Sequence, residues 1–437
     1  MTPVAVGLAS SGAIVGLIYS GLHVATALAL TSLVGVWLIR GDFEVGANLL
    51  LLAARDGIAT YEFAVIPLFV LMGLLVGVAD IGAEAFNAAN RLFRRVKGGL
   101  GVATVAANAV FAAVTGVSIA SAAIFTRLAV PEMLRFGYDR RFAVGIVAGS
   151  SILGMLIPPS LLMIIFGIIA EVSIGKLFLA GVVPGILMAC IFSAIVVATA
   201  HLRPASVGRA VETGGARQPE LRSPVLRPLA TVGLLVAVVI GGIYGGFFTP
   251  TEAGAVGALL ALLVALARRR LSRRNTWEVL VETGKITASI CLLVIAATVY
   301  SRMLAMSGAV ALIGEAVAGI GLGFHGTLVV YLAILVVLGC LLDSVSILLI
   351  TVPIAYPVFI ALGADPIWFG IITIIAVEMG LLTPPLGISV FVVKATLEDA
   401  SITLHDVFMG ALPFVLGMAA CLGVLIAAPW LVTAIVR

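Results

Sequence analysis

The stretch that decides the fold is a six-residue motif that occurs twice, as GMLIPP at 154–159 and as GLLTPP at 380–385. Each copy lies inside a long apolar run. Proline lacks a backbone N–H and its ring clashes with the preceding turn, so a Pro-Pro pair interrupts a helix. The backbone carbonyls next to each pair then lose their partners within the helix. We therefore predict two helices that are broken in the middle, over 142–170 and 367–395.

The composition shows that the apolar character extends over the whole chain. Of 437 residues, 62% are hydrophobic and 11% are charged, and the mean hydropathy is +1.26. A soluble domain carries about 25% charged residues. This excludes a soluble enzyme, a nucleic-acid binder and a disordered protein. We expect no cofactor, disulfide or cysteine metal site, because all four cysteines fall in apolar stretches. The first apolar run lacks a preceding basic region, so we expect no removable signal peptide.

Membrane spans follow from apolar runs of about 20 residues. Besides the two broken helices, such runs predict spans at 4–20, 22–39, 63–80, 178–200, 228–246, 252–268, 284–304 and 406–433. Two further runs are interrupted by small polar clusters, 99–130 by TGVS (115–118) and 326–361 by DSVS (343–346). Their halves, about 15 residues each, are short for a crossing. We expect re-entrant helical hairpins in an all-α polytopic membrane protein, with protein or water around each tip.

The basic residues predict the orientation of these spans. Most of the 25 Lys and Arg residues lie in four clusters, at 91–97, 135–141, 203–227 and 268–274. The span order puts all four clusters on one side, which the positive-inside rule makes cytoplasmic. Both termini are then expected outside. An amphipathic helix is expected at the cytoplasmic surface over 82–97, with a counterpart at the outer surface over 308–320.

A single offset of 226 residues relates the two halves. It pairs Gly82 with Gly308, Ser118 with Ser344, Pro131 with Pro357, Gly154 with Gly380, Pro158 with Pro384, and Pro159 with Pro385. One such match is weak evidence, but six matches with hairpins entering from opposite faces favour an inverted-topology repeat. We divide the chain into repeat 1 (1–201), a cytoplasmic linker (202–227) and repeat 2 (228–437).

Inverted repeats with broken helices place their binding site near the bilayer midplane. Free carbonyls attract cations there, while bare helix N-termini attract anions. Hydroxyls are expected opposite each break, from Ser118 at the first and from Ser344 and Ser346 at the second, with Thr383 in the second break itself. Oxygen-only ligands suit a hard cation such as sodium.

Two acidic residues lie in this apolar setting. An ionised Asp343 costs about 2.5–3.5 kcal/mol at the bilayer centre, which indicates a function. A direct sodium ligand, a group that orients a ligand without touching the ion, and a proton carrier all remain open. Glu378 precedes the second break by two residues. It either faces the site or makes a structural hydrogen bond to a helix end.

Three segments resemble one family: GSSILGMLIPPSLLMIIFGIIAEVSIGKLFLAGVVPG (149–185), TPTEAGAVGA (249–258) and GLLTPPLGISVFVV (380–393). They resemble the DctM-like large membrane subunit of tripartite ATP-independent periplasmic (TRAP) transporters, and the resemblance runs across essentially the whole chain. It implies an elevator-type permease, similar to the ion-transporter superfamily, in a prokaryotic, multi-pass inner membrane. Such a permease imports a small carboxylate (a C4-dicarboxylate, sialic acid or similar) with sodium from a periplasmic DctP-like binding protein. A small DctQ-like membrane subunit is expected as a separate polypeptide, because the chain starts directly with large-subunit sequence.

The resemblance also implies the site residues. The first ion site would use Gly116, Ser118, Gly154, Ile157 and Pro159, and the second would use Asp343, Ser346, Gly380 and Thr383. The substrate would lie near Pro158, Ser160, Ser344, Pro384 and Pro385. The first tip, TGVSIASA (115–122), departs from a family pattern close to SGSSVADA. Since Val117 replaces a hydroxyl and Ser121 replaces an acid, direct side-chain ligation is less secure at the first site than at the second, where backbone carbonyls are not needed to compensate.

In this interpretation the hairpins and broken helices move against a scaffold of 1–80, 178–268 and 284–304. The alternative within transport is a standalone sodium- or proton-coupled anion carrier that needs no binding protein. An intramembrane protease would need HExxH, GxGD or a Ser-His pair at membrane depth, and none is found. A channel fits poorly, because paired dead-end hairpins favour alternating access.

Overall fold

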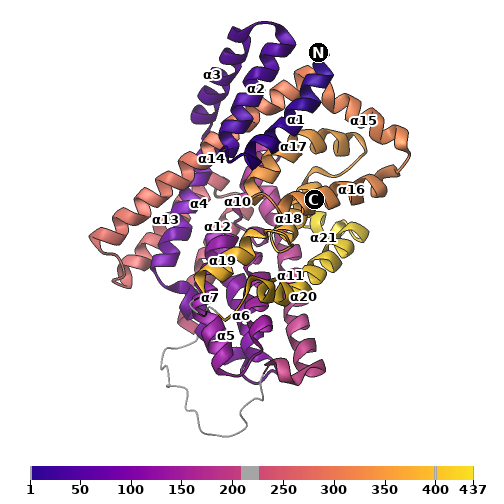
Figure 1. The fold of residues 1–437 in the computed structure, drawn as a ribbon. Helices are drawn as coiled ribbons and strands as arrows, with labels where there is room; N and C mark the ends of the chain where they lie inside the picture. The colour runs from indigo at the N-terminus through magenta and orange to yellow at the C-terminus, as the bar shows by residue number, and fades with distance from the viewer. Residues whose placement is uncertain (1, 208–225, 398, 400, 437) are drawn as a thin grey trace.

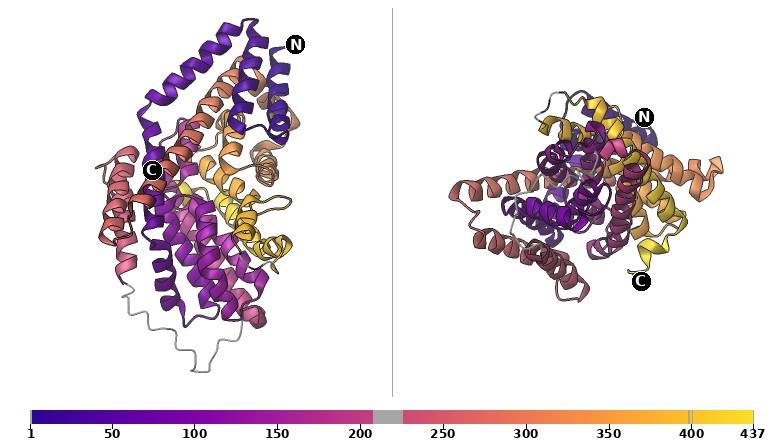
Figure 2. Two further views of the ribbon diagram at one scale, coloured as in Figure 1. Left: turned by 60° about the vertical axis from the view of Figure 1, so that its left-hand side comes forward. Right: turned by 90° about the horizontal axis from the view of Figure 1, so that it is seen from below.

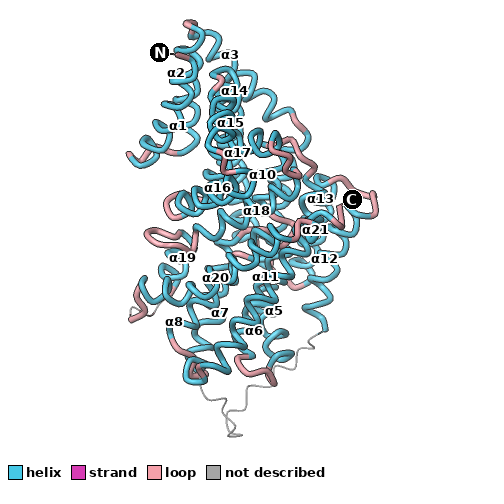
Figure 3. The backbone as a smooth tube through the Cα atoms, turned by 90° about the vertical axis from the view of Figure 1, so that its right-hand side faces the viewer, coloured by secondary structure: helices cyan, strands magenta, loops and turns pink. Residues whose placement is uncertain are grey.

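The computed structural model contains helices and connecting loops, and the part of the chain that it describes contains no strand (Figures 1 and 3). The structure describes residues 2–207, 226–397, 399 and 401–436. Most of the expected linker 202–227 therefore lies outside the described residues.

The helices of the N-terminal half stop at the two places that the sequence predicts. Their bounds are α1 Pro3–Tyr19, α2 Val24–Arg40, α3 Phe43–Ala59, the 3-10 turn η1 Tyr61–Ala64, α4 Val65–Val78, α5 Ile81–Phe93, α6 Gly99–Thr115, α7 Ser118–Arg135, α8 Arg140–Ser151, α9 Leu153–Leu156, α10 Leu161–Ile169, α11 Ile174–Leu202 and η2 Pro204–Val207. The chain turns between α6 and α7 at Gly116, whose φ of 64° lies in the left-handed region that glycine adopts without strain. A second interruption, at 157–160, separates α9 from α10.

The helices of the C-terminal half follow the same order. Their bounds are α12 Leu226–Tyr244, α13 Pro250–Ala267, α14 Arg273–Ser307, α15 Ala309–Ile320, α16 Gly323–Gly339, α17 Ser344–Ala361, α18 Pro366–Gly380, α19 Ile388–Thr396, α20 Leu404–Ala427 and α21 Trp430–Thr433. α7 and α17 both have 18 residues, and their first residues, Ser118 and Ser344, are the pair that the 226-residue offset relates.

The length and composition of the helices confirm an all-helical, multi-span membrane protein. Six described helices, counting η1 with α4 as one, are long and apolar enough to cross a bilayer: Tyr61–Val78, Ile174–Leu202, Pro250–Ala267, Arg273–Ser307, Ser344–Ala361 and Leu404–Ala427. The pair Arg140–Leu156 and Leu161–Ile169 also qualifies, but it bends by 43° at the first Pro-Pro.

Several expected bounds are corrected. The halves of both hairpins are longer than the expected 15 or so residues, at 17 and 18. The second tip comprises 340–343 rather than 343–346, because Asp343 caps α17 and the serines that follow it already belong to the helix. α3 corresponds to no predicted span, since its polar residues interrupt the apolar run.

The helices divide between two ends and a diagonal. α1–α3 lie at one end of the molecule and α5–α7 at the other, while α14 runs obliquely between them (Figure 1). α12 and α13 lie on the side opposite α20 and α21 (Figure 2). An aromatic cluster fixes α18 against its neighbours, with Phe369 4.9 Å from Phe359, 5.3 Å from Tyr331 and 6.3 Å from Phe166 between ring centroids. This packing holds the helix that precedes the second break.

Candidate functional site at the two helix breaks

The first hairpin tip packs directly on the first helix break. The carbonyl oxygen of Gly116 accepts a hydrogen bond from the backbone N–H of Leu161, 3.3 Å away. Gly154 faces the other side of the tip, since a Cβ added to it would lie 3.0 Å from the carbonyl carbon of Val117. A Cβ added to Gly116 would lie 2.5 Å from the carbonyl oxygen of Pro159. The structure therefore brings Gly116, Gly154 and Pro159 together, and only glycine fits at the first two positions.

The second hairpin tip packs on the second break in the same way. A Cβ added to Gly380 would lie 2.6 Å from the Cα of Gly339, so the two backbones touch. The backbone N–H of Gly387, after the Pro-Pro pair, lies 3.4 Å from the carbonyl oxygen of Cys340 that accepts its hydrogen bond. The hydroxyl of Thr383 donates to the carbonyl of Met379 at 2.9 Å.

Asp343 has a defined structural role at this tip. Its carboxylate accepts a hydrogen bond from the backbone N–H of Ser346 at 3.1 Å and a second one from the Ser346 hydroxyl. These bonds cap the N-terminus of α17. Asp343 is half-buried rather than enclosed. The carboxylate oxygens keep further lone pairs, so the cap is compatible with either ion-related role expected for Asp343.

The two breaks differ in exposure. Pro158, Pro159 and Ser160 are buried, and Ile157 is half-buried. Pro384 and Pro385 are exposed, and so is Leu386, at 43%. The first break is thus enclosed by protein while the second opens at the surface.

The hydroxyls expected near the substrate already have partners. Ser160 caps α10 by accepting from the N–H of Met163 at 3.4 Å, and its hydroxyl donates to the carbonyl of Met155 at 2.5 Å. The Ser344 hydroxyl donates to Oε1 of Glu378 at 2.7 Å. Both side chains are held in fixed orientations.

Glu378 and Ser118 are buried with incomplete hydrogen bonding. Both side chains are 0% exposed, and neither Oε2 of Glu378 nor Oγ of Ser118 has a hydrogen-bond partner. The Ser118 hydroxyl faces the Glu378 carboxyl group. The structure thus places one carboxyl group of α18 between the first residues of α7 and α17.

A second buried polar cluster, missed by sequence reasoning, has complete hydrogen bonding. The Asn108 amide donates to the Ser150 hydroxyl at 2.6 Å and accepts from the Ser121 hydroxyl at 2.5 Å. Polar residues within the apolar α6 and α8 were the available signal. Ser121, where the family pattern has an acid, is therefore used to hold α7 against α6.

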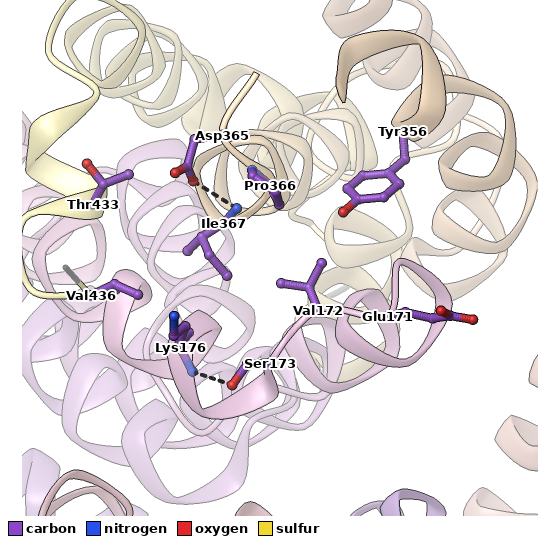
Figure 4. Close-up of a pocket in the computed structure, with 10 residues that line it drawn as sticks. All are labelled: Glu171, Val172, Ser173, Lys176, Tyr356, Asp365, Pro366, Ile367, Thr433 and Val436. Atoms are coloured by element: carbon purple, nitrogen blue, oxygen red, sulfur yellow. Dashed lines mark hydrogen bonds between the residues drawn. The ribbon is translucent and has the colours of Figure 1, made fainter. Parts of the chain in front are cut away.

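The polar cavity with the clearest walls lies elsewhere. It measures about 440 Å³ and is lined by Glu171, Val172, Ser173, Lys176, Tyr356, Asp365, Pro366, Ile367, Thr433 and Val436 (Figure 4). None of the predicted ion or substrate residues lines it. Among the described residues, no group of three His, Cys, Asp or Glu side chains could hold a metal ion. Any cation at the breaks must therefore bind chiefly to hydroxyl and backbone oxygens.

The comparisons with known proteins agree with this architecture. The crystal structure of the YdaH transporter of Alcanivorax borkumensis matches with a TM-score of 0.51 at 17% identity, covering 89% of this chain and 90% of that chain, which shows the fold alone. The C4-dicarboxylate TRAP transporter large permease protein DctM of Pseudomonas aeruginosa is 34% identical over 82% of each chain. The sialic acid TRAP transporter large permease protein SiaM of Vibrio cholerae is 31% identical over 91% of each.

The family description "Tripartite ATP-independent periplasmic transporter, DctM component" matches residues 12–431, nearly the whole chain. A match of this extent, together with relatives above 30% identity, settles the family. The chain belongs to the DctM family of TRAP transporter large permeases, and it is a multi-pass bacterial membrane protein that transports solute and is not an enzyme.

Proposed function

We propose that the chain is the large permease subunit of a sodium-coupled secondary transporter that imports a small organic acid anion. The observation that carries the proposal is the pairing of each helix break with a hairpin tip, with glycine-only contacts at Gly116, Gly154 and Gly380. Relatives named for C4-dicarboxylates and sialic acid support a carboxylate substrate. The substrate lies between the breaks, near Pro158, Ser160, Ser344, Pro384 and Pro385.

The breaks fit two sodium ions, which are cargo of the transport cycle. The first ion is assigned to Gly116, Ser118, Gly154, Ile157 and Pro159, and the second to Asp343, Ser346, Gly380 and Thr383. The unpaired, fully buried Ser118 hydroxyl supports the first assignment, because such a group needs a partner. Binding of the cations offsets the anion's charge and orders the tips before the substrate moves.

The matching bounds of the elements in the two halves support an inverted-topology repeat of 1–201 and 228–437, joined by the linker 202–227. We assign α6–α10 and α16–α19 to a transport domain that moves as an elevator. α11 packs on α6 and α18, and α20 packs on α8. We therefore add both helices to the transport domain, which revises the expectation that α11 belongs to the scaffold. The scaffold then comprises α1–α4 and α12–α14.

The orientation follows from the basic clusters, which we place in the cytoplasm, with both termini in the periplasm of the inner membrane. A separate DctQ-like small subunit and a periplasmic DctP-like binding protein complete the system. The binding protein would deliver the anion on the outer side, where the proposed orientation puts the ends of hairpin 2.

The first test is a thermal melt of the detergent-purified chain, titrated with sodium against potassium at constant ionic strength. A ligand that binds only the folded state raises stability by RT ln(1 + [L]/Kd). We expect a sodium-specific rise in Tm. In vesicles containing the small subunit and binding protein, Asp343→Asn combined with Thr383→Ala should abolish sodium-driven uptake, and intact uptake would refute the assignment.

A standalone carrier is the competing function. The same vesicles distinguish the two, because a standalone carrier would move free substrate equally fast without the binding protein. We expect uptake only when the binding protein is present.

A further inference from the structure

Glu378 carries a charge that the proposed sites do not use. Among the side chains that the structure describes, it is the only Asp, Glu, Lys or Arg that is buried, at 0% exposure. An isolated carboxylate is strongly disfavoured away from water, so it requires a counter-charge or a proton. Its one hydrogen bond comes from Ser344, a neutral hydroxyl.

The unpaired atoms around Glu378 are confined to one place. Oε2 of Glu378 and Oγ of Ser118 both lack a partner, and they belong to residues that face each other. On the same helix, one turn away, the hydroxyl of Ser121 is equally buried but fully paired with Asn108. The core of the first hairpin is therefore well satisfied, and the gap lies only between α7 and α18. Two unpaired oxygens from different helices are typical of ligands that share a cation.

The charge at the first tip points the same way. Of the two tips, the second has Asp343, whereas TGVSIASA at the first contains no acid. The offset of 226 pairs Glu378 with Ile152, so this carboxyl group has no counterpart in the other half. Glu378 thus brings a negative charge from the second half of the chain to the first hairpin.

We propose that Oε2 of Glu378 and Oγ of Ser118 are the two side-chain ligands of the cation at the first tip. Glu378 supplies the charge that the tip itself lacks, and Ser344 holds the other carboxylate oxygen in place. This inference rests on the proposed function and adds one residue to its first ion site. Since Ser344 begins α17, two residues before the second-site ligand Ser346, the same carboxyl group links the two ion sites.

The test compares Glu378→Gln and Ser118→Ala with Ser121→Ala in sodium and potassium melts. Gln has the shape of Glu and still accepts from Ser344, but it has no charge. We expect the sodium concentration at half-maximal stabilisation to rise at least about tenfold in both site variants, the equivalent of about 1.4 kcal/mol. Ser121→Ala should lower Tm equally in both salts, because it leaves Asn108 unpaired, and should keep the wild-type sodium midpoint.

Equilibrium dialysis with radioactive sodium gives a second readout. At a fixed sodium concentration that saturates the wild type, Glu378→Gln and Ser118→Ala should each bind one ion fewer per chain, and Asp343→Asn should lose the other. A wild-type sodium midpoint and wild-type stoichiometry in Glu378→Gln would overturn the inference, because the carboxyl group would then act without charge. If Glu378→Gln does not fold, Ser118→Ala alone decides. A wild-type chain without any sodium-specific response would instead refute the proposed function, so the two failures are distinguishable.

Discussion

Asp343 combines two roles that single substitutions can separate. Asparagine is as good an N-cap as aspartate, whereas alanine in place of a capping residue costs about 1 kcal/mol. We therefore expect Asp343→Asn to melt in potassium like the wild type, and Asp343→Ala to melt lower. Both variants should need more sodium for the same rise in Tm. If Asp343→Asn kept the wild-type sodium titration, the Asp343 charge would not belong to the second ion site.

At the residue scale, the sequence predicted the positions that the backbone geometry dictates. The Pro-Pro pairs, Gly116 and Gly154 were found because proline and glycine have few structural substitutes. The environment of Glu378 was left open between two interpretations, and it proved to involve the side chain of Ser344. The approach of Ser118 to Glu378 brings together residues 260 positions apart in the chain, and no local pattern encodes such a contact.

At the scale of elements, Arg268 joins a scaffold helix to the surface helix α5. Its guanidinium donates to the carbonyl of Ala79 at 3.1 Å and pairs with Glu84 at 2.8 Å, and the Arg268 side chain is only 17% exposed. A hydrogen bond to a charged group contributes about 1.5–3 kcal/mol when shielded. We expect Arg268→Ala to lower the free energy of unfolding by about 1–3 kcal/mol.

Arg269→Ala is the matched control, because Arg269 is the exposed neighbour of Arg268. It should change Tm little. Melting of both variants at low and high salt provides the measurement. Equal melting temperatures for the two variants would mean that the α13–α5 contact does not depend on this ion pair.

The elements also show where apolar patterns fail. The amphipathic helix expected at 82–97 is present as α5, and the one expected at 308–320 as α15. α3 was missed because Glu44, Asn48, Arg55 and Asp56 break its apolar run, although the helix begins with a standard cap, Asp42, which accepts from the N–H of Glu44 at 2.8 Å. The capping signal was readable, but a search for membrane spans does not detect it.

At the scale of the whole molecule, the proposed elevator requires the first hairpin to slide past α4. Gly73 on α4 touches the hairpin tip, since a Cβ added there would lie 2.9 Å from the carbonyl oxygen of Thr115. Overpacking of this kind costs about 1–3 kcal/mol. We expect Gly73→Ala to slow uptake by about tenfold, which corresponds to about 1.4 kcal/mol in the barrier, while sodium still raises Tm.

Gly77→Ala is the control for this prediction. Gly77 lies one turn further along the same helix, and an added Cβ there would meet no atom within 4 Å. Uptake should stay at the wild-type rate. Equal slowing by both substitutions would show that the flexibility of α4, rather than its clearance from the hairpin, limits transport.

The length of α14 has a consequence for the surrounding lipid. With 35 residues, this unbroken helix is about 52 Å long, whereas the hydrocarbon core of a bilayer measures about 30 Å. At a tilt of about 40°, the upper end of the usual range, it would still extend about 40 Å along the membrane normal. A rigid rod of that reach contacts both headgroup layers at once. The permease is therefore mechanically coupled to bilayer thickness, and thinner or thicker membranes should change the angle at which this rod braces the moving parts.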